Sequence, residues 1–423
     1  MTEDFLHFVW KYGLFDREGI LADTSDEIRV FNLGEHNMDA GPDFLNTRIQ
    51  IGSTTWAGNV EIHLKSSDWQ SHKHHRDKAY DNVILHVVYE NNQPVYRSNG
   101  EVIPTMELRF NPDLYNNYCQ LLSQKSQLPC REKIGKVDSL IVDLWISSLV
   151  IERMQQKTGH IAGLLEQYRN NWDEVFYICL ARSFGFGLNA MPFEILARSV
   201  PLSSLMRHRD NPRQLEALLL GQSGFLEEGR LYDDYYTELR EEYMHLKNKY
   251  HLKPLEKHLW KFLRLRPVNF PTVRIAQFAS VLQHSGLFSH LLACSSVDDL
   301  KRFFTVKTSE YWDTHYNFET GSVRLVKRLG KEAFHTLVIN TVIPFMFQYG
   351  RMTAREDLKD KALGWLQNIP AENNRYTRQW ASIMSSPDNA FYSQGILQLL
   401  KEYCSKKRCL ACSVGSHIIT RGL

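Results

Sequence analysis

Residues 41–69 read GPDFLNTRIQIGSTTWAGNVEIHLKSSDW, and this stretch decides the fold of the N-terminal part of the chain. Two runs in which apolar and polar residues alternate, 43–51 and 54–65, flank the dipeptide Gly52-Ser53. A small, turn-forming dipeptide between two alternating runs is typical of a β-hairpin with a tight turn. The sequence therefore predicts a hairpin at the centre of this part.

Further strands and helices are predicted on both sides of the hairpin. Residues 27–33 and 101–110 read as strands, and 82–90 (NVILHVVYE) is apolar at its centre, as expected of a strand buried on both faces. A polar helix is predicted over 68–80. A second, amphipathic helix is predicted at the N-terminus, with an apolar face of Phe5, Leu6, Val9 and Trp10. This order favours a mixed sheet with helices on both faces.

The pattern changes near residue 111, where Asn111-Pro112-Asp113 predicts the start of a helix. From there onward apolar residues recur at spacings of three and four, and glycine and proline separate the helical segments. No fixed-period repeat is evident, so a bundle is favoured over a solenoid. We expect an α/β domain over residues 1–130 and a large all-α domain over 131–423.

Composition limits the classes of protein to be considered. Hydrophobic residues make up 43% of the chain and the formal net charge is +2, so the whole-chain field does not indicate a nucleic-acid-binding protein. The N-terminus lacks the features of a secretory signal, and no apolar run is long enough to span a membrane. Seven cysteines in 423 residues do not suggest a disulfide scaffold. We therefore expect a cytoplasmic protein with no membrane partner.

The hairpin carries the residues of a candidate catalytic site. Side chains alternate along a strand, so Glu61, His63 and Lys65 share one face, and the hairpin brings that face beside Asp43. Two carboxylates at a strand edge suit a divalent cation such as Mg²⁺ or Mn²⁺. Such a cation can activate water and neutralise charge on a phosphodiester.

These residues resemble the PD-(D/E)XK nuclease-like superfamily, which has a PD dipeptide at the start of a strand, a hairpin, and an acid-x-Lys triplet. The resemblance covers about the first 110 residues and includes the order of elements of the restriction-endonuclease-like core. It implies a metal-dependent nuclease with Asp43 and Glu61 as metal ligands. The sequence departs from the pattern at His63, which stands in place of the lysine, and Lys65 is a candidate replacement. Because inactive relatives often lose that lysine, a non-catalytic nucleic-acid-binding or scaffold protein is the alternative.

The whole chain also resembles an uncharacterised bacterial domain-of-unknown-function family. The resemblance is carried by the stretches GPDF, GNVEIH, SSDW and ILHVV. It implies no activity.

A third hypothesis comes from histidines clustered next to Glu61. They are His63, His72, His74, His75 and His86. Neutral imidazole is the commonest ligand of transition metals in proteins, so a hydrolase that uses Zn²⁺ or Mn²⁺ is a rival. Against it, the middle three are expected to be solvated at the start of the polar helix, and their spacing matches no H-E-x-x-H signature.

Three cysteines lie within nine residues of the tail, at Cys404, Cys409 and Cys412. Clustered thiols of this kind predict a Zn²⁺ site or an iron–sulfur cluster, with Cys130 or His417 as the fourth ligand. Some nucleases of the resembled superfamily hold a cluster with one upstream and three C-terminal cysteines. The basic residues that flank the tail cysteines are expected to lower the thiol pKa values. The remaining cysteines, Cys119, Cys179 and Cys294, are expected in the core.

Residues 245–267 contain five lysines and two arginines against one acid, with aromatic residues between them. Phosphates are attracted to such a patch, and aromatic rings can stack on bases. We predict nucleic-acid contacts from Lys253, Lys257, Lys261 and Arg264. The alternative is an amphipathic helix with a solvated basic face and Trp260 in the core.

Overall fold

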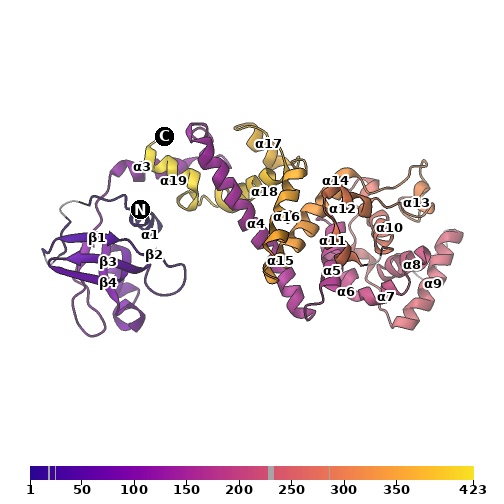
Figure 1. Cartoon of the computed structure of the whole chain (residues 1–423), viewed down its shortest axis with the longest axis horizontal. Helices are drawn as coiled ribbons and strands as arrows, with labels where there is room; N and C mark the ends of the chain where they lie inside the picture. Colours follow the sequence, from indigo (N-terminus) through magenta and orange to yellow (C-terminus); the bar gives the residue numbers. More distant parts are fainter. Residues whose placement is uncertain (18–19, 24, 227–232, 285) are drawn as a thin grey trace. The chain divides into compact units, whose positions relative to one another are not determined.

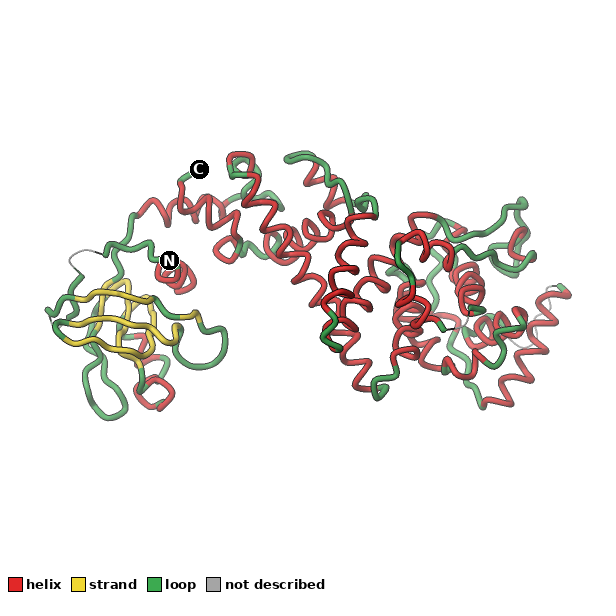
Figure 2. Tube along the Cα trace, in the orientation of Figure 1, coloured by secondary structure: helices red, strands yellow, loops and turns green. Residues whose placement is uncertain are grey.

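The computed structural model describes residues 1–17, 20–23, 25–226, 233–284 and 286–423. The chain divides into two compact units: residues 1–145 together with 399–423, and residues 146–398. The named strands all lie in the first unit, and the second is helical (Figure 2). The class predicted from the sequence, an α/β domain followed by a large helical domain, is confirmed. The tail after residue 398 belongs to the first unit, whereas the sequence placed it in the helical domain.

The first unit is built on a mixed sheet (Figure 1). Its strands are β1 (Ile28–Asn32), β2 (Glu35–His36), β3 (Phe44–Ile51), β4 (Thr54–Lys65), β5 (Val83–Glu90) and β6 (Thr105–Glu107). They lie in the order β1-β3-β4-β5-β6, and β2 also pairs with β3. Strand β3 is antiparallel to β1 and β4, whereas β4, β5 and β6 are parallel. The predicted hairpin is confirmed, with β3 and β4 joined at Gly52 and Ser53.

Helix α1 (Glu3–Lys11) packs on β4. Its predicted apolar face is confirmed, because Phe5, Leu6, Val9 and Trp10 are all buried. The indole Nε1 of Trp10 donates a hydrogen bond to the carbonyl of Leu33 at 3.0 Å, which ties the helix to the loop after β1.

The long polar helix predicted over 68–80 is wrong. The segment forms α2 (Asp68–Ser71) and two 3₁₀ turns, η1 (His74–Arg76) and η2 (Lys78–Tyr80). Lys73 has a φ of 66°, a left-handed conformation that ends the α-helix at this point. The segment therefore folds back over the sheet, and two of its histidines, His72 and His74, contact residues of β4.

Strand β5 is buried over its first six residues, as predicted for a strand covered on both faces. The last strand is shorter than the predicted 101–110, because only β6 pairs with β5. Pro104 has no N–H to donate to the ladder, although its carbonyl still accepts from the amide of His86 at 2.9 Å.

The rest of the first unit is helical and brings the tail back to the chain after the sheet. It consists of α3 (Pro112–Ser123), η3 (Ile134–Lys136), the start of α4 (Ser139–Gln167), the π-helical turn η7 (Leu399–Cys404), η8 (Cys409–Ala411) and α19 (Ser413–Arg421). Helix α3 starts at the predicted Asn111 cap, and Asn117 donates to the carbonyl of Ile419 at 3.1 Å. Cys119 is exposed on α3, so its predicted core position is wrong.

The second unit packs around one continuous apolar core. After α4, its helices are α5 (Trp172–Phe184), α6 (Ala190–Ser199), α7 (Leu202–Met206), α8 (Pro212–Gln222), α9 (Asp234–Tyr250), α10 (Pro271–Leu282), α11 (Leu287–Ala293), α12 (Val297–Phe304), α13 (Tyr311–Thr314), α14 (Lys331–Leu337), α15 (Ile343–Met352), α16 (Glu356–Asn368), α17 (Arg375–Ala381) and α18 (Ala390–Gln398). It also contains the short turns η4 (Lys257–Leu259), η5 (Pro267–Asn269) and η6 (Val338–Val342). Among the described helices, none combines the length and apolar character needed to cross a bilayer.

We expect Gly58→Val to destabilise the β4–β5 pair by about 2–3 kcal/mol, since overpacking of this kind typically costs 1–3 kcal/mol or more. A Cβ at Gly58 would lie 2.4 Å from Ile84 Cγ2 and 2.8 Å from the carbonyl oxygen of Asn82, and backbone cannot move aside easily. The matched control is Ala57→Val on the exposed neighbouring position, for which a change within about 0.5 kcal/mol is expected. Hydrogen exchange of the β4 and β5 amides measures both. Equal protection in the two variants would contradict the argument.

Candidate metal centre

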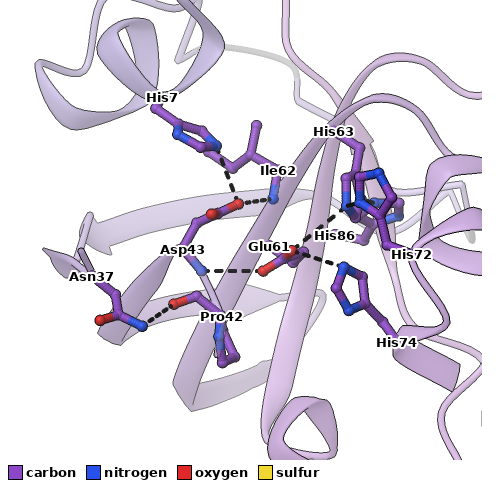
Figure 3. A network of polar contacts seen from close by, with 10 residues as sticks. All are labelled: His7, Asn37, Pro42, Asp43, Glu61, Ile62, His63, His72, His74 and His86. Atoms are coloured by element: carbon purple, nitrogen blue, oxygen red, sulfur yellow. Dashed lines mark hydrogen bonds and ion pairs between the residues drawn. The ribbon is translucent and has the colours of Figure 1, made fainter. Parts of the chain in front are cut away.

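The open end of the β3–β4 hairpin joins Asp43 to Glu61. Phe44 pairs with Val60, so the residues just beyond this pair face each other. The backbone N–H of Asp43 donates to Glu61 Oε2 at 3.1 Å, and the N–H of Ile62 donates to Asp43 Oδ2 at 2.9 Å. Each carboxylate therefore accepts a hydrogen bond from the backbone beside the other, and the two predicted acids belong to one polar network (Figure 3).

His63 lies two residues after Glu61 on β4 and is only 2% exposed. Its Nδ1 is 2.8 Å from Nε2 of His86 on β5, and its Nε2 is 3.1 Å from Nδ1 of His72. The same Nε2 lies 3.6 Å from Glu61 Oε1. One imidazole thus contacts a carboxylate and two further imidazoles.

His74 completes the arrangement from the 3₁₀ turn η1. Its Nε2 lies 3.3 Å from Glu61 Oε1, and its ring packs on Tyr80 with the centroids 3.8 Å apart. This nitrogen is buried yet makes no hydrogen bond of good geometry with the described residues. The expectation that His74 is solvated is wrong, because its side chain is only 11% exposed.

One ligand atom from each of His63, His72 and His74 lies within 4.8 Å of the corresponding atoms of the other two. Among the described residues, these three histidines form the group that meets this criterion. Glu61 contacts two of them, so four donors of nitrogen and oxygen converge, as Figure 3 shows. The sequence flagged all four residues but did not predict that they meet.

His7 is a member of the network that the sequence analysis missed. It lies on α1, and its Nε2 is 3.2 Å from Asp43 Oδ2. The contact depends on how α1 packs against the sheet, so local pattern carries no direct sign of it. The available signal was a histidine between apolar residues of an amphipathic helix, which points its side chain towards the protein rather than to solvent.

Burial and neighbouring charges set the protonation states of the network. Burial, aided by His86, His74 and His72, lowers the pKa of His63 to about 2. Burial likewise lowers the pKa of His86 to about 3. Both imidazoles are therefore neutral at pH 7. Burial raises the pKa of Glu61, and the contact with His74 Nε2, 3.3 Å from Glu61 Oε1, opposes this.

His7 behaves in the opposite way to the buried imidazoles. Burial acts to lower its pKa, but the hydrogen bond to Asp43 and the charge of that carboxylate outweigh burial, so the pKa of His7 is raised. The network thus places neutral imidazoles on the Glu61 side and a readily protonated one on the Asp43 side.

Lys65 lies outside these contacts. It is at the end of β4, its side chain is 51% exposed, and its Nζ lies 3.2 Å from Oε2 of Glu90 on β5. His63, which stands where the nuclease-like pattern expected from the sequence has a lysine, lies 3.6 Å from Glu61 Oε1. The resemblance to the nuclease-like superfamily stays a prediction.

A groove of about 590 Å³ in the first unit adjoins His7. Its cations come from α1 and from the loop between η7 and η8, and aromatic residues lie between them. They are Lys11, Lys406, Lys407 and Arg408, with Tyr12 and Tyr118. The four cations are all exposed. Asp4 also lines the groove and Lys406 is ion-paired with Glu402, so the groove carries a local excess of cations rather than positive charge alone.

The predicted nucleic-acid segment 245–267 is not one helix. Helix α9 ends at Tyr250, and the rest is irregular apart from the turn η4. Lys253, Lys261 and Arg264 are exposed, whereas Lys257 is half-buried. Trp260 is 5% exposed and its Nε1 donates to the carbonyl of Ser223 at 2.9 Å, so this ring is not available to stack on a base.

The four predicted metal-binding cysteines, Cys130, Cys404, Cys409 and Cys412, all lie in the first unit and are buried, reduced thiols. The prediction that basic neighbours lower their pKa values is wrong. Burial raises the pKa of Cys409 to about 11, and Lys407 opposes this only in part. Within the described ranges, their sulfurs form no group as tight as that of the three imidazoles.

A family model described as "Protein of unknown function (DUF2851)" matches residues 3–375, so the chain belongs to this family. The resemblance to a domain-of-unknown-function family is thereby confirmed. No curated protein matches the chain significantly, and no solved structure does.

Proposed function

We propose that this protein is a metal-dependent, nuclease-like hydrolase of nucleic-acid phosphodiesters whose cation is bound by Glu61, His63, His72 and His74. The observation that carries the proposal is the convergence of three imidazole ligand atoms within 4.8 Å of one another, next to a buried carboxylate. Strongly perturbed titratable groups gathered in this way are typical of functional sites.

The spacing of the donors supports metal binding. A tetrahedral site with bonds of about 2.0–2.1 Å places its ligand atoms about 3.3 Å apart. His63 Nε2 lies 3.1 Å from His72 Nδ1 and 3.6 Å from Glu61 Oε1. His74 Nε2 lies 3.3 Å from Glu61 Oε1. The cluster thus needs little rearrangement to enclose one ion.

The chemistry of the donors favours Zn²⁺ or Mn²⁺ over Mg²⁺. Imidazole nitrogen suits transition metals, whereas Mg²⁺ prefers oxygen ligands and retains water. Metal binding also requires neutral imidazoles, and the lowered pKa of His63 meets this requirement.

Neighbouring residues hold the ligands in position. Metal binding through His63 Nε2 requires its Nδ1 to carry the proton and to donate to His86 Nε2, 2.8 Å away. Asp43 anchors the hairpin end that carries Glu61. His7, with its raised pKa, can deliver a proton from the Asp43 side. A bound cation would polarise a phosphoryl oxygen and lower the pKa of an attacking water.

The basic groove beside His7 supports a nucleic-acid substrate. Its four exposed cations, of which Lys406, Lys407 and Arg408 are consecutive, suit the repeated charges of a phosphodiester backbone. The groove belongs to the same unit as the metal centre, so one substrate strand can contact both.

A second candidate, a nucleic-acid-binding or scaffold protein without catalysis, is favoured by one observation. The superfamily's lysine is replaced by His63, and Lys65 contacts Glu90 instead. A site without that lysine lacks the usual cation that stabilises developing charge.

The test uses the full chain, stripped of metal and resupplied with Zn²⁺, Mn²⁺ or Mg²⁺. Bound metal is measured by mass spectrometry, and hydrolysis is followed with labelled single-stranded DNA, duplex DNA and RNA. We expect Zn²⁺ or Mn²⁺ to bind and to restore hydrolysis of at least one substrate. Binding of metal and nucleic acid without hydrolysis under any cation would favour the second candidate. If no metal binds, or if Glu61→Ala leaves metal binding unchanged, the proposed hydrolase is refuted and the second candidate is favoured.

A further inference from the structure

The second cluster of metal-binding side chains is built from two distant parts of the sequence. Cys130 lies in the turn after α3, Cys404 ends η7, Cys409 starts η8, and Cys412 precedes α19. Helix α3 packs against η8 and α19, and η7 packs against η8. Each of the four thiols is 7–8% exposed. The fold therefore carries the tail cysteines back to the part of the unit that holds Cys130, one of the two candidate fourth ligands that the sequence left open beside His417.

The four thiols lie close enough to act on one another. Burial raises the pKa of Cys130 to about 12, and the thiols of Cys412 and Cys409 raise it further. Burial also raises the pKa of Cys404, to which Cys412, Cys130 and Cys409 all contribute. The packing of α3, η7, η8 and α19 thus gathers four buried sulfur donors in one part of the unit, and thiolate sulfur is a preferred donor to thiophilic metals.

The backbone that follows Cys412 offers N–H groups to its sulfur. Burial raises the pKa of its thiol, but the backbone N–H groups of Val414 and Gly415 point at the sulfur and act in the opposite sense. Close packing makes this possible: a Cβ at Gly415 would lie 2.4 Å from the carbonyl oxygen of Cys409. N–H groups directed at sulfur stabilise its negative form.

We propose that Cys130, Cys404, Cys409 and Cys412 bind a thiophilic metal centre through four thiolates, with release of the thiol protons. The centre fixes both ends of the loop 405–408, because this loop lies between the ligands Cys404 and Cys409. The loop carries three of the four cations of the basic groove. Lys407 donates to the carbonyl of Leu122, and Arg408 lies over the ring of Tyr403 at 5.1 Å.

Two forms of the centre share this chemistry. Four sulfurs on one Zn²⁺ lie about 3.8 Å apart, because Zn–S bonds are about 2.3 Å. An iron–sulfur cluster binds its thiolates on different iron atoms and accepts wider spacing. In the described part of the chain no three cysteine sulfurs fall within 4.8 Å of one another, so a single zinc ion requires the side chains to draw together.

The proposal is tested with the full chain purified without oxygen, carrying His74→Ala so that metal at the histidine cluster does not contribute. Zinc and iron are measured by mass spectrometry, and visible absorbance distinguishes a cluster from zinc. We expect about one zinc ion or one cluster per chain, falling below about a tenth of that in Cys404→Ser and Cys412→Ser. Cys119→Ser and Cys294→Ser are the controls, and both should keep the metal.

If the ligand variants fail to fold, a thiol-reactive mercurial titrated into the otherwise unchanged chain decides. Release of zinc or loss of the cluster absorbance in step with thiol modification supports the site. Metal-free protein after incubation with Zn²⁺ or with iron and sulfide under reducing conditions overturns it, as does full metal content in Cys404→Ser. The role of the loop in the groove rests on the proposed function, whereas the metal content does not. A chain that binds this metal but hydrolyses no substrate would contradict only the proposed function.

Discussion

His74→Ala is expected to weaken binding of Zn²⁺ or Mn²⁺ at the histidine cluster by at least about 100-fold, because even outer-shell partners of metal ligands are worth 10–100-fold. The change removes the nitrogen that lies 3.3 Å from Glu61 Oε1. Hydrolysis should fall by at least the same factor at limiting metal. Metal titration by calorimetry and rates at several metal concentrations measure both effects.

His75→Ala is the matched control for this prediction. The residue is the neighbour of His74 on the same 3₁₀ turn, but its Nε2 accepts a hydrogen bond from Arg76 rather than facing Glu61. We expect its metal affinity and rate to stay within about threefold of the unmodified protein, as for a substitution away from the site. If His75→Ala lost as much affinity as His74→Ala, the ligand set would be wrong.

The sequence predicted the part of the site that depends on local structure. The alternation on both sides of Gly52-Ser53 predicted the hairpin, and the hairpin's register alone brings Asp43 beside Glu61. These contacts involve residues fewer than 20 positions apart, as their sequence separations of 18 and 19 show. Pattern is informative at this range because strand pairing fixes which side chains are adjacent.

The remaining ligands could not be placed in the same way. His72 contacts His63 and His74 contacts Glu61. Lys73 between them takes a left-handed conformation, which polar periodicity does not reveal. A continuous helix would have left the His74 side chain in solvent, as the sequence analysis expected, whereas His72 is exposed as expected. His7 contacts Asp43 from an element 36 residues away in sequence, and only packing of α1 on β4 brings them together.

Clusters of lysine and arginine in the sequence also failed to show where in the fold a basic surface lies beside the candidate site. The segment 245–267 has the highest count of cations, yet it lies in the unit without the metal centre and its best stacking candidate is buried. The shorter basic run 406–408 lies beside His7 because the tail packs in the first unit. The groove beside His7 and the segment 245–267 are therefore two candidate nucleic-acid interfaces, and substitutions in each can be compared directly.

Reversing Lys11, Lys406 and Arg408 to glutamate together is expected to weaken nucleic-acid binding by about 100-fold or more at low salt, because phosphate contacts dominate such affinities. The three cations line the groove beside His7. Lys407 is left unchanged because its ammonium donates to the carbonyl of Leu122 and supports the loop. Loss of three phosphate contacts should also reduce the slope of log affinity against log salt by about 2–3. Fluorescence anisotropy with labelled single strands, at several salt concentrations, measures both.

The same charge change in the other unit is the control: Lys253, Lys261 and Arg264 reversed together. All three are exposed, as are the three groove cations, and both triple substitutions lower the formal net charge by the same amount. Because Arg408 lies over the ring of the buried Tyr403, the thermal midpoint of both variants is measured alongside binding. If affinity depended only on net charge, the two variants would lose it equally, since long-range attraction does not distinguish the faces. A selective loss in the groove variant locates the substrate beside the metal centre. A selective loss in the control would instead place the interface on the segment 245–267 and separate nucleic-acid binding from the histidine cluster.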